Sequence, residues 1–92
     1  MQLPSPQIKC LLFSTNELII TEIEEVDSQI GEPDCKLTNP CVVHYGVKIS
    51  SGLTPWLDDV TNQNVFMVSS DKILTLFDPK PSLLKEYKLL FP

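Results

Sequence analysis

The chain has 92 residues, of which 42% are hydrophobic and 21% charged, so we expect a single globular domain with a small core. The formal net charge is −5 and all seven basic residues are lysines, which disfavours a strong DNA or RNA binder because arginine supplies bidentate contacts to phosphate and guanine. No apolar stretch approaches the roughly 20 residues of a membrane span, and the start lacks a signal-peptide pattern, so we expect a cytoplasmic protein.

Two apolar runs near the start predict a β-hairpin. Residues 8–13 (IKCLLF) are apolar enough for a strand that is buried on both faces, and Ser14 and Asn16 follow as turn formers. Residues 18–26 (LIITEIEEV) are apolar first and half polar later, as in a long strand that bends around a small core. Between Glu17 and Asp34 the chain has seven carboxylates and no lysine, which indicates a solvated strand face and loop in preference to a cation site.

The middle of the chain predicts a loop, a strand and an irregular connection. Residues 27–34 (DSQIGEPD) form the loop, and residues 35–45 (CKLTNPCVVHY) resume a strand pattern. Pro40 cannot donate to a strand ladder, so it predicts a bulge or an edge strand. Residues 46–64 contain short strand-like pieces around an SSG turn. Trp56, within this segment, is either a core side chain, which we favour, or an exposed contact for another protein.

The last third predicts two strands and a helix. Residues 65–77 (VFMVSSDKILTLF) are two apolar runs around a four-residue polar turn, which is typical of a hairpin. Residues 82–90 (SLLKEYKLL) have helical spacing, with Ser82 as N-cap and an apolar stripe of Leu83, Leu84, Tyr87 and Leu90. We therefore expect an all-β fold with a short C-terminal helix. It would be a small, strongly bent five-stranded barrel over about residues 8–77 with a helix over about 82–90, in one domain spanning 1–92.

The three cysteines are scattered, and an odd number favours reduced thiols over a disulfide framework. Cys10, Cys35, Cys41 and His44 could be assembled into a zinc site, but the close cysteine pair typical of such sites is missing, so core thiols are favoured. The chain has no HExxH motif, P-loop or nucleophile motif. We expect neither an enzyme nor a bound metal or cofactor.

The order of these elements resembles the Sm and Sm-like (LSm) RNA-binding proteins. NELIITEIEEVDSQIGEPDCKL falls where the first Sm motif lies, and MVSSDKILTL falls where the second lies, with Ser69 and Ser70 in place of its Arg-Gly pair. Over nearly its full length the chain also resembles a group of proteins of marine cyanophages, in which segments like EVDSQIGEPDCKLTNP and SSDKILTLFDPKP recur.

This resemblance implies a homo-oligomeric ring of about five to seven subunits, joined through edge strands within residues 65–77. In the Sm family, loops of the two motifs form a pocket around the pore that binds single-stranded RNA. The corresponding loops here are Gly31–Lys36 and Ser69–Lys72. Lys36 and Lys72 are expected to approach phosphate, while Asp34, Ser69 or Ser70 would hydrogen-bond a base edge. The RNA-binding residues implied by the resemblance are Gly31, Asp34, Lys36, Ser69, Ser70, Asp71 and Lys72.

The resemblance thus predicts a ring-forming RNA-binding or RNA-regulatory protein of a cyanophage, acting in the cytoplasm of the infected bacterium, without DNA specificity and without a membrane partner. The alternative is an Sm-fold ring that serves as a protein-interaction or structural module and binds no RNA. The missing arginine, the missing stacking residue and the negative net charge favour this alternative.

Overall fold

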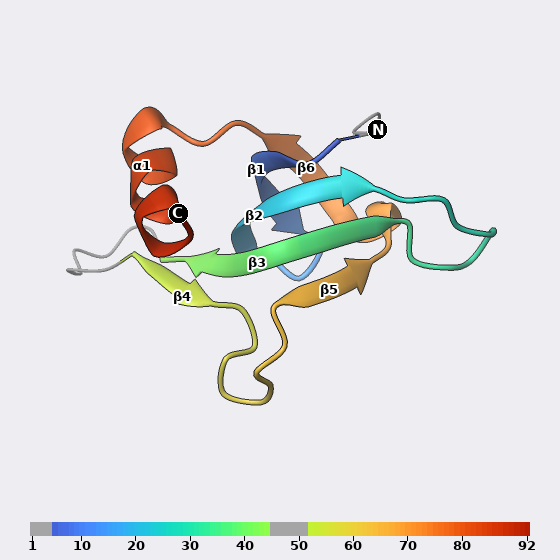
Figure 1. The fold of residues 1–92 in the computed structure, drawn as a ribbon. Helices are drawn as coiled ribbons and strands as arrows, with labels where there is room; N and C mark the ends of the chain where they lie inside the picture. The colour runs from blue at the N-terminus through green and yellow to red at the C-terminus, as the bar shows by residue number, and fades with distance from the viewer. Residues whose placement is uncertain (1–4, 45–51) are drawn as a thin grey trace.

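The chain folds into one antiparallel sheet with a helix packed on one face, in a computed structural model that describes residues 5–44 and 52–92 (Figure 1). Within those residues the sheet has six strands in the order β4-β3-β2-β1-β6, and β5 also pairs with β3. The elements are β1 (Gln7–Phe13), β2 (Leu18–Glu25), β3 (Cys35–Val43), β4 (Leu53–Pro55), β5 (Val65–Val68), β6 (Ile73–Phe77) and α1 (Pro81–Leu90). The prediction of an all-β fold with a short C-terminal helix is confirmed. The described residues form six strands where five were predicted, and the additional one is the three-residue β4, in the segment where only short strand-like pieces were expected.

The first hairpin is confirmed. β1 and β2 pair antiparallel, with Leu12 opposite Leu18 next to the turn. Asn16 has a φ of 71°, in the left-handed region that asparagine tolerates better than most residues. Backbone bonds of 2.9 to 3.0 Å close the turn, from Asn16 N–H to Phe13 O and from Phe13 N–H to Glu17 O. The local turn chemistry therefore sets this register.

The predicted hairpin over residues 65–77 is wrong. β5 pairs with β3, where Met67 lies opposite Lys36, whereas β6 pairs with β1, where Leu76 lies opposite Leu11. A 3₁₀ helix, Ser70–Lys72, carries the chain from one edge of the sheet to the other. In the described residues no pairing joins β5 to β6, so the sheet is open. Both are edge strands, as predicted, and β4 shares the edge of β5.

Pro40 lies in a β-bulge of β3, as one of the two predicted alternatives requires. On β2 only Thr21 stands between the paired residues Ile20 and Glu22, whereas on β3 both Asn39 and Pro40 stand between their partners. The bulge divides β3 into two halves. The first half of the strand pairs with β5 and the second half pairs with β4. One long strand thereby holds two different neighbours along the same edge.

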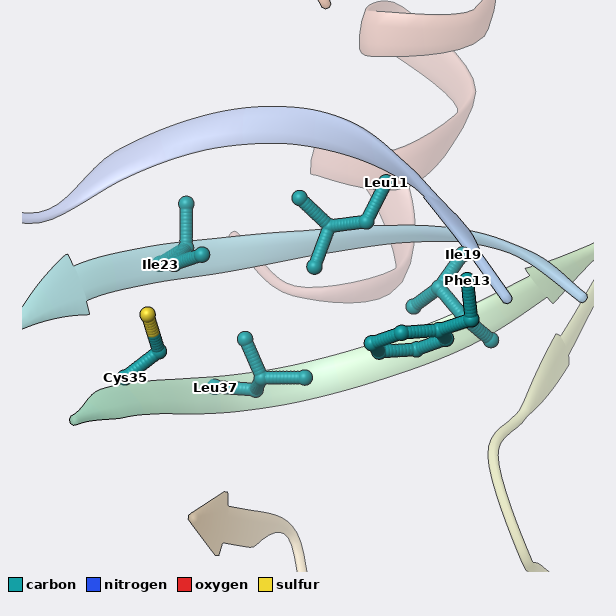
Figure 2. Packing of buried hydrophobic residues seen from close by; sticks show 6 residues of the cluster. All are labelled: Leu11, Phe13, Ile19, Ile23, Cys35 and Leu37. Atoms are coloured by element: carbon teal, nitrogen blue, oxygen red, sulfur yellow. The ribbon is translucent and has the colours of Figure 1, made fainter. Parts of the chain in front are cut away.

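The sheet buries side chains on both faces. The inner core consists of the buried residues Leu11, Phe13, Ile19, Ile23, Cys35 and Leu37, and Figure 2 shows them between the curved strands. The helix-side core consists of Cys10, Ile20, Cys41, Leu53 and Tyr87. Consecutive residues such as Cys10 and Leu11 are both buried because successive side chains of a strand point to opposite faces. The prediction that this first strand is buried on both faces is confirmed.

Helix α1 covers the helix-side core, in a way that only partly matches the predicted stripe. Tyr87 is buried, and Leu83 and Phe91 pack beside it, whereas Leu90 is 50% exposed. The helix starts one residue earlier than predicted, at Pro81, where the missing backbone N–H of proline is harmless. The N-cap is accordingly Lys80 rather than Ser82.

Tyr87 ties the helix to the bulge. Its hydroxyl donates to the backbone oxygens of Asn39 at 2.8 Å and Thr38 at 3.2 Å. The buried Thr21 hydroxyl lies 3.1 Å from the same Thr38 oxygen. Backbone groups that the bulge takes out of the ladder are therefore hydrogen-bonded to side chains.

Two expectations concern other parts of the chain. Most of the predicted SSG turn, at residues 50–52, lies outside the described residues. In the described part of the chain, no helix has both the length and the apolar character needed to cross a membrane.

Candidate functional site

The two loops that the resemblance singles out meet at Asp34 and Ser70. The Oδ1 atom of Asp34 accepts the backbone N–H of Ser70, and its Oδ2 atom accepts the Ser70 hydroxyl, both at 2.7 Å. The backbone N–H of Asp34 donates to Val68 O at 3.2 Å, at the end of β5. The β2–β3 loop and the β5–β6 connection are therefore fastened together within one subunit.

Asp34 caps the 3₁₀ helix from across the chain. The residue before this helix, Ser69, makes no side-chain cap bond, so the carboxylate of Asp34 satisfies the first N–H instead. The hydrogen bonds from the Ser70 hydroxyl and then from its backbone N–H hold the pKa of Asp34 below the usual 3.8, because both favour the charged form. Each oxygen of Asp34 thus accepts a hydrogen bond from Ser70. The position of this carboxylate is therefore explained by the fold, and no ligand is needed to explain it.

The two lysines of the predicted site lie on different sides of the sheet. Cys35 and Leu37 point into the inner core, so Lys36 between them points to the opposite face, where its Nζ lies 3.7 Å from Glu24 Oε1. Lys72 is exposed at the end of the 3₁₀ helix and makes no ion pair within the described residues. The structure does not bring these two side chains together in one subunit.

The remaining predicted residues are exposed or serve the turns. Figure 1 shows the β2–β3 loop projecting away from the sheet. Gly31 lies in a turn of this loop. Its φ of 88° and the bond from Glu32 N–H to Gln29 O at 3.0 Å fit a type II turn, for which glycine is suited. Ser69 accepts the backbone N–H of Lys72 at 3.1 Å, and Asp71 is exposed.

Sequence reasoning missed a hollow of about 310 Å³ beside Trp56. It is lined by Phe13, Ser14, Thr15, Glu17, Trp56, Val68 and Lys72. Trp56 is half-buried, stacks on Phe13 with ring centroids 5.8 Å apart and also contacts Phe66 at 5.2 Å. Its indole N–H donates to Glu17 Oε2 at 3.1 Å. Trp56 thus packs against the inner core and also borders open space, so each of its two predicted roles describes one part of the side chain.

The cysteines are buried free thiols, as predicted. Cys35 belongs to the inner core, whereas Cys10 and Cys41 belong to the helix-side core, so the three sulfurs do not converge. Burial raises the pKa of Cys35 and Cys41 to about 11 and also raises that of Cys10, because an apolar environment disfavours the thiolate. His44 is exposed and lies 2.9 Å from the Thr54 hydroxyl. These side chains are core and surface groups rather than a metal-binding cluster.

Comparison with known proteins gives one family and no curated relative. No curated protein matches the chain. Residues 6–91 match the model of a family described as "Family of unknown function (DUF6561)". This match covers all the described strands and the helix, from β1 through α1. The chain therefore belongs to the DUF6561 family.

Proposed function

We propose that this protein forms an Sm-like ring, in which the open, bent sheets of neighbouring subunits join through β5 and β6 and the fastened loops contact single-stranded RNA. The observation that carries the proposal is the Asp34–Ser70 contact, which joins the two loops that the Sm resemblance assigns to the RNA pocket. Lys72, exposed and without an ion pair in the described part of the chain, stands at the end of this joined segment.

The edges of the sheet support the assembly. β5 and β6 lie at opposite edges, and neither contains a proline or a lysine to block pairing. Three of their large apolar side chains are exposed in the single chain, namely Met67, Leu74 and Phe77. Pairing β5 of one copy with β6 of the next is a heterologous contact, which generates a ring when the rotation closes.

A ring compensates for the weak charge of each subunit. One Lys72 on a chain of net charge −5 attracts phosphate poorly. A ring repeats that lysine once in each subunit, and simultaneous contacts along one strand raise the avidity. Affinity that comes from phosphate contacts falls steeply with salt, and without arginine or a stacking side chain in these loops the base preference should be shallow.

The test is a titration of fluorescent oligo-uridine and oligo-adenosine at low and moderate salt. We expect saturable, salt-sensitive binding by the wild type and weaker binding by Lys72→Ala. Lys36→Ala is expected to have the smaller effect, because Lys36 already pairs with Glu24. Lys88→Ala, an exposed lysine on α1, is the matched control. Absence of saturable binding at low salt, or equal binding by wild type and Lys72→Ala, would contradict the RNA part of the proposal.

A second candidate is a ring that serves as a protein-interaction or structural module without RNA. It is favoured by contacts that already occupy two of the predicted RNA-binding side chains. Ser70 hydrogen-bonds to both oxygens of Asp34, and Lys36 pairs with Glu24. In that case the oligomer forms with its full mass, and no oligonucleotide binds to it at low salt. The two candidates share the ring and differ only in this titration.

A further inference from the structure

We propose that the hollow beside Trp56 is a nucleotide-binding site that holds the base against its aromatic wall and the phosphate at Lys72. The inference goes beyond the proposed function and shares with it only Lys72 as the phosphate contact. It adds a place for the base that lies outside the two loops. The hollow holds about 310 Å³, and its walls and rim come from the β1–β2 turn, the segment after β4, the end of β5 and the 3₁₀ helix.

The apolar wall consists of Phe13, Trp56 and Val68. The buried Phe13 ring stacks on Trp56 with an interplanar angle of 24° and so holds the half-buried Trp56 ring in place, which offers the aromatic surface that borders the hollow. Nucleobases stack on such surfaces whatever their sequence, because each base has a π-face. An aromatic hollow with a few polar groups at its rim is the usual form of a small-ligand site.

Glu17 supplies a fixed acceptor at the rim. Its Oε2 atom accepts the Trp56 indole N–H at 3.1 Å, and its Oε1 atom accepts the Thr15 hydroxyl at 3.2 Å. These bonds orient the carboxylate, and each oxygen keeps a second lone pair. Guanine presents two adjacent N–H donors, at N1 and at its amino group, which match the two oxygens of a carboxylate. The geometry therefore favours guanine over uracil, which offers a single N–H.

Lys72 supplies the cation at the same rim. Its side chain lines the hollow, and among the described residues it has no carboxylate partner. A lysine ammonium binds phosphate as a point charge, without the planar match that an arginine would need. A carboxylate for the base and an ammonium for the phosphate thus border one aromatic hollow, and this combination suits a nucleotide better than a purely apolar ligand.

Trp56 is the only tryptophan of the chain, so its fluorescence reports on the hollow directly. The experiment titrates the full chain with GMP, UMP and ribose 5-phosphate while the emission is recorded. We expect a saturable change with GMP, a weaker response to UMP and none with ribose 5-phosphate. Glu17→Gln and Lys72→Ala should each raise the Kd for GMP roughly tenfold, the effect of one lost charged hydrogen bond. Glu32→Gln and Lys88→Ala, at exposed positions away from the hollow, should leave it unchanged.

Three results would overturn this site: no saturable change with millimolar GMP, the same response to ribose 5-phosphate as to GMP, or equal losses in the control variants. The outcome is separable from that of the proposed function. If oligo-uridine binds while GMP leaves Trp56 emission unchanged, the hollow fails and the loop proposal stands. If GMP binds and oligonucleotides do not, the loop proposal fails and the hollow stands.

Discussion

At the scale of single residues, the Asp34–Ser70 contact should make stability depend on pH in the acid range. The folded-state pKa of Asp34 lies below its usual 3.8, so its stabilising contribution is fully present above that value and is lost as pH falls through the lower folded pKa. We expect Asp34→Asn to lower the melting temperature at pH 7 and to flatten the decline in stability below about pH 4. Thermal melts from roughly pH 2.5 to pH 7 measure both effects, because this range extends below the usual carboxyl pKa.

The matched control for this prediction is Glu32→Gln, an exposed carboxylate in the same loop. Ser70→Ala should reproduce part of the Asp34→Asn effect, and the double variant should lose less than the sum, because both changes break the same contact. Strictly additive losses, or an Asp34→Asn protein with the wild-type pH profile, would show that the contact contributes nothing to stability.

A second residue-scale prediction concerns the hydroxyl of Tyr87. Tyr87→Phe keeps the buried ring but removes the donor to the Asn39 and Thr38 oxygens at the bulge. We expect unfolding free energy to fall by about 1 to 3 kcal/mol, the usual cost of leaving a buried acceptor without its partner. Urea unfolding measures it, with Lys85→Ala on the exposed face of α1 as control. A loss equal to that of the control would mean that water replaces the hydroxyl.

At the scale of elements, the helix should stabilise the fold through one face only. Leu83 packs on the helix-side core, whereas Leu89 is 73% exposed. We expect Leu83→Ala to cost about 2 to 3 kcal/mol of unfolding free energy, and Leu89→Ala less than about 0.5. The same substitution on the same helix makes these two variants a matched pair in urea unfolding. Equal losses would place the buried face elsewhere.

The local elements were predictable because their signals are local. The apolar run of residues 8–13, the turn at Asn16 and the bulge at Pro40 follow from side-chain patterns and backbone chemistry that act over a few residues. The pairing of β5 and β6 was not predictable in this way. Two apolar runs around a short polar segment fit a hairpin as well as they fit two separate edge strands. The observed arrangement depends on tertiary pairing, of β5 with β3 and of β6 with β1.

The candidate site shows the same division. Asp34 and Ser70, from the two loops that the resemblance singled out, are in contact, whereas the orientation of Lys36 depends on which face of β3 the core occupies. The Trp56 hollow gave no motif, because its lining comes from four separate segments of the chain. The sequence offered only the weak signal of a large aromatic residue in an irregular segment, which fits core and contact roles alike.

At the scale of the whole molecule, the open edges of the sheet predict self-association. Leu74 on β6 is 63% exposed and Met67 on β5 is 47% exposed, so both would be covered if β5 of one copy paired with β6 of another. We expect wild-type protein to have the mass of about five to seven subunits by light scattering at micromolar concentration. Leu74→Lys and Met67→Lys should shift the mass toward the monomer, because a charged lysine on an edge strand blocks pairing.

Leu89→Lys is the control for this experiment, since it places the same charge on another exposed leucine, which lies on α1 and away from both edges. It should keep the wild-type mass. A wild-type protein that is monomeric at micromolar concentration would contradict the ring. If Leu89→Lys dissociated the oligomer while the two edge variants remained assembled, the subunits would instead join through the helix. A monomer would lack the avidity on which RNA binding through Lys72 depends. In an oligomer joined through the helix, the copies of Lys72 would be arranged differently from those in the proposed ring.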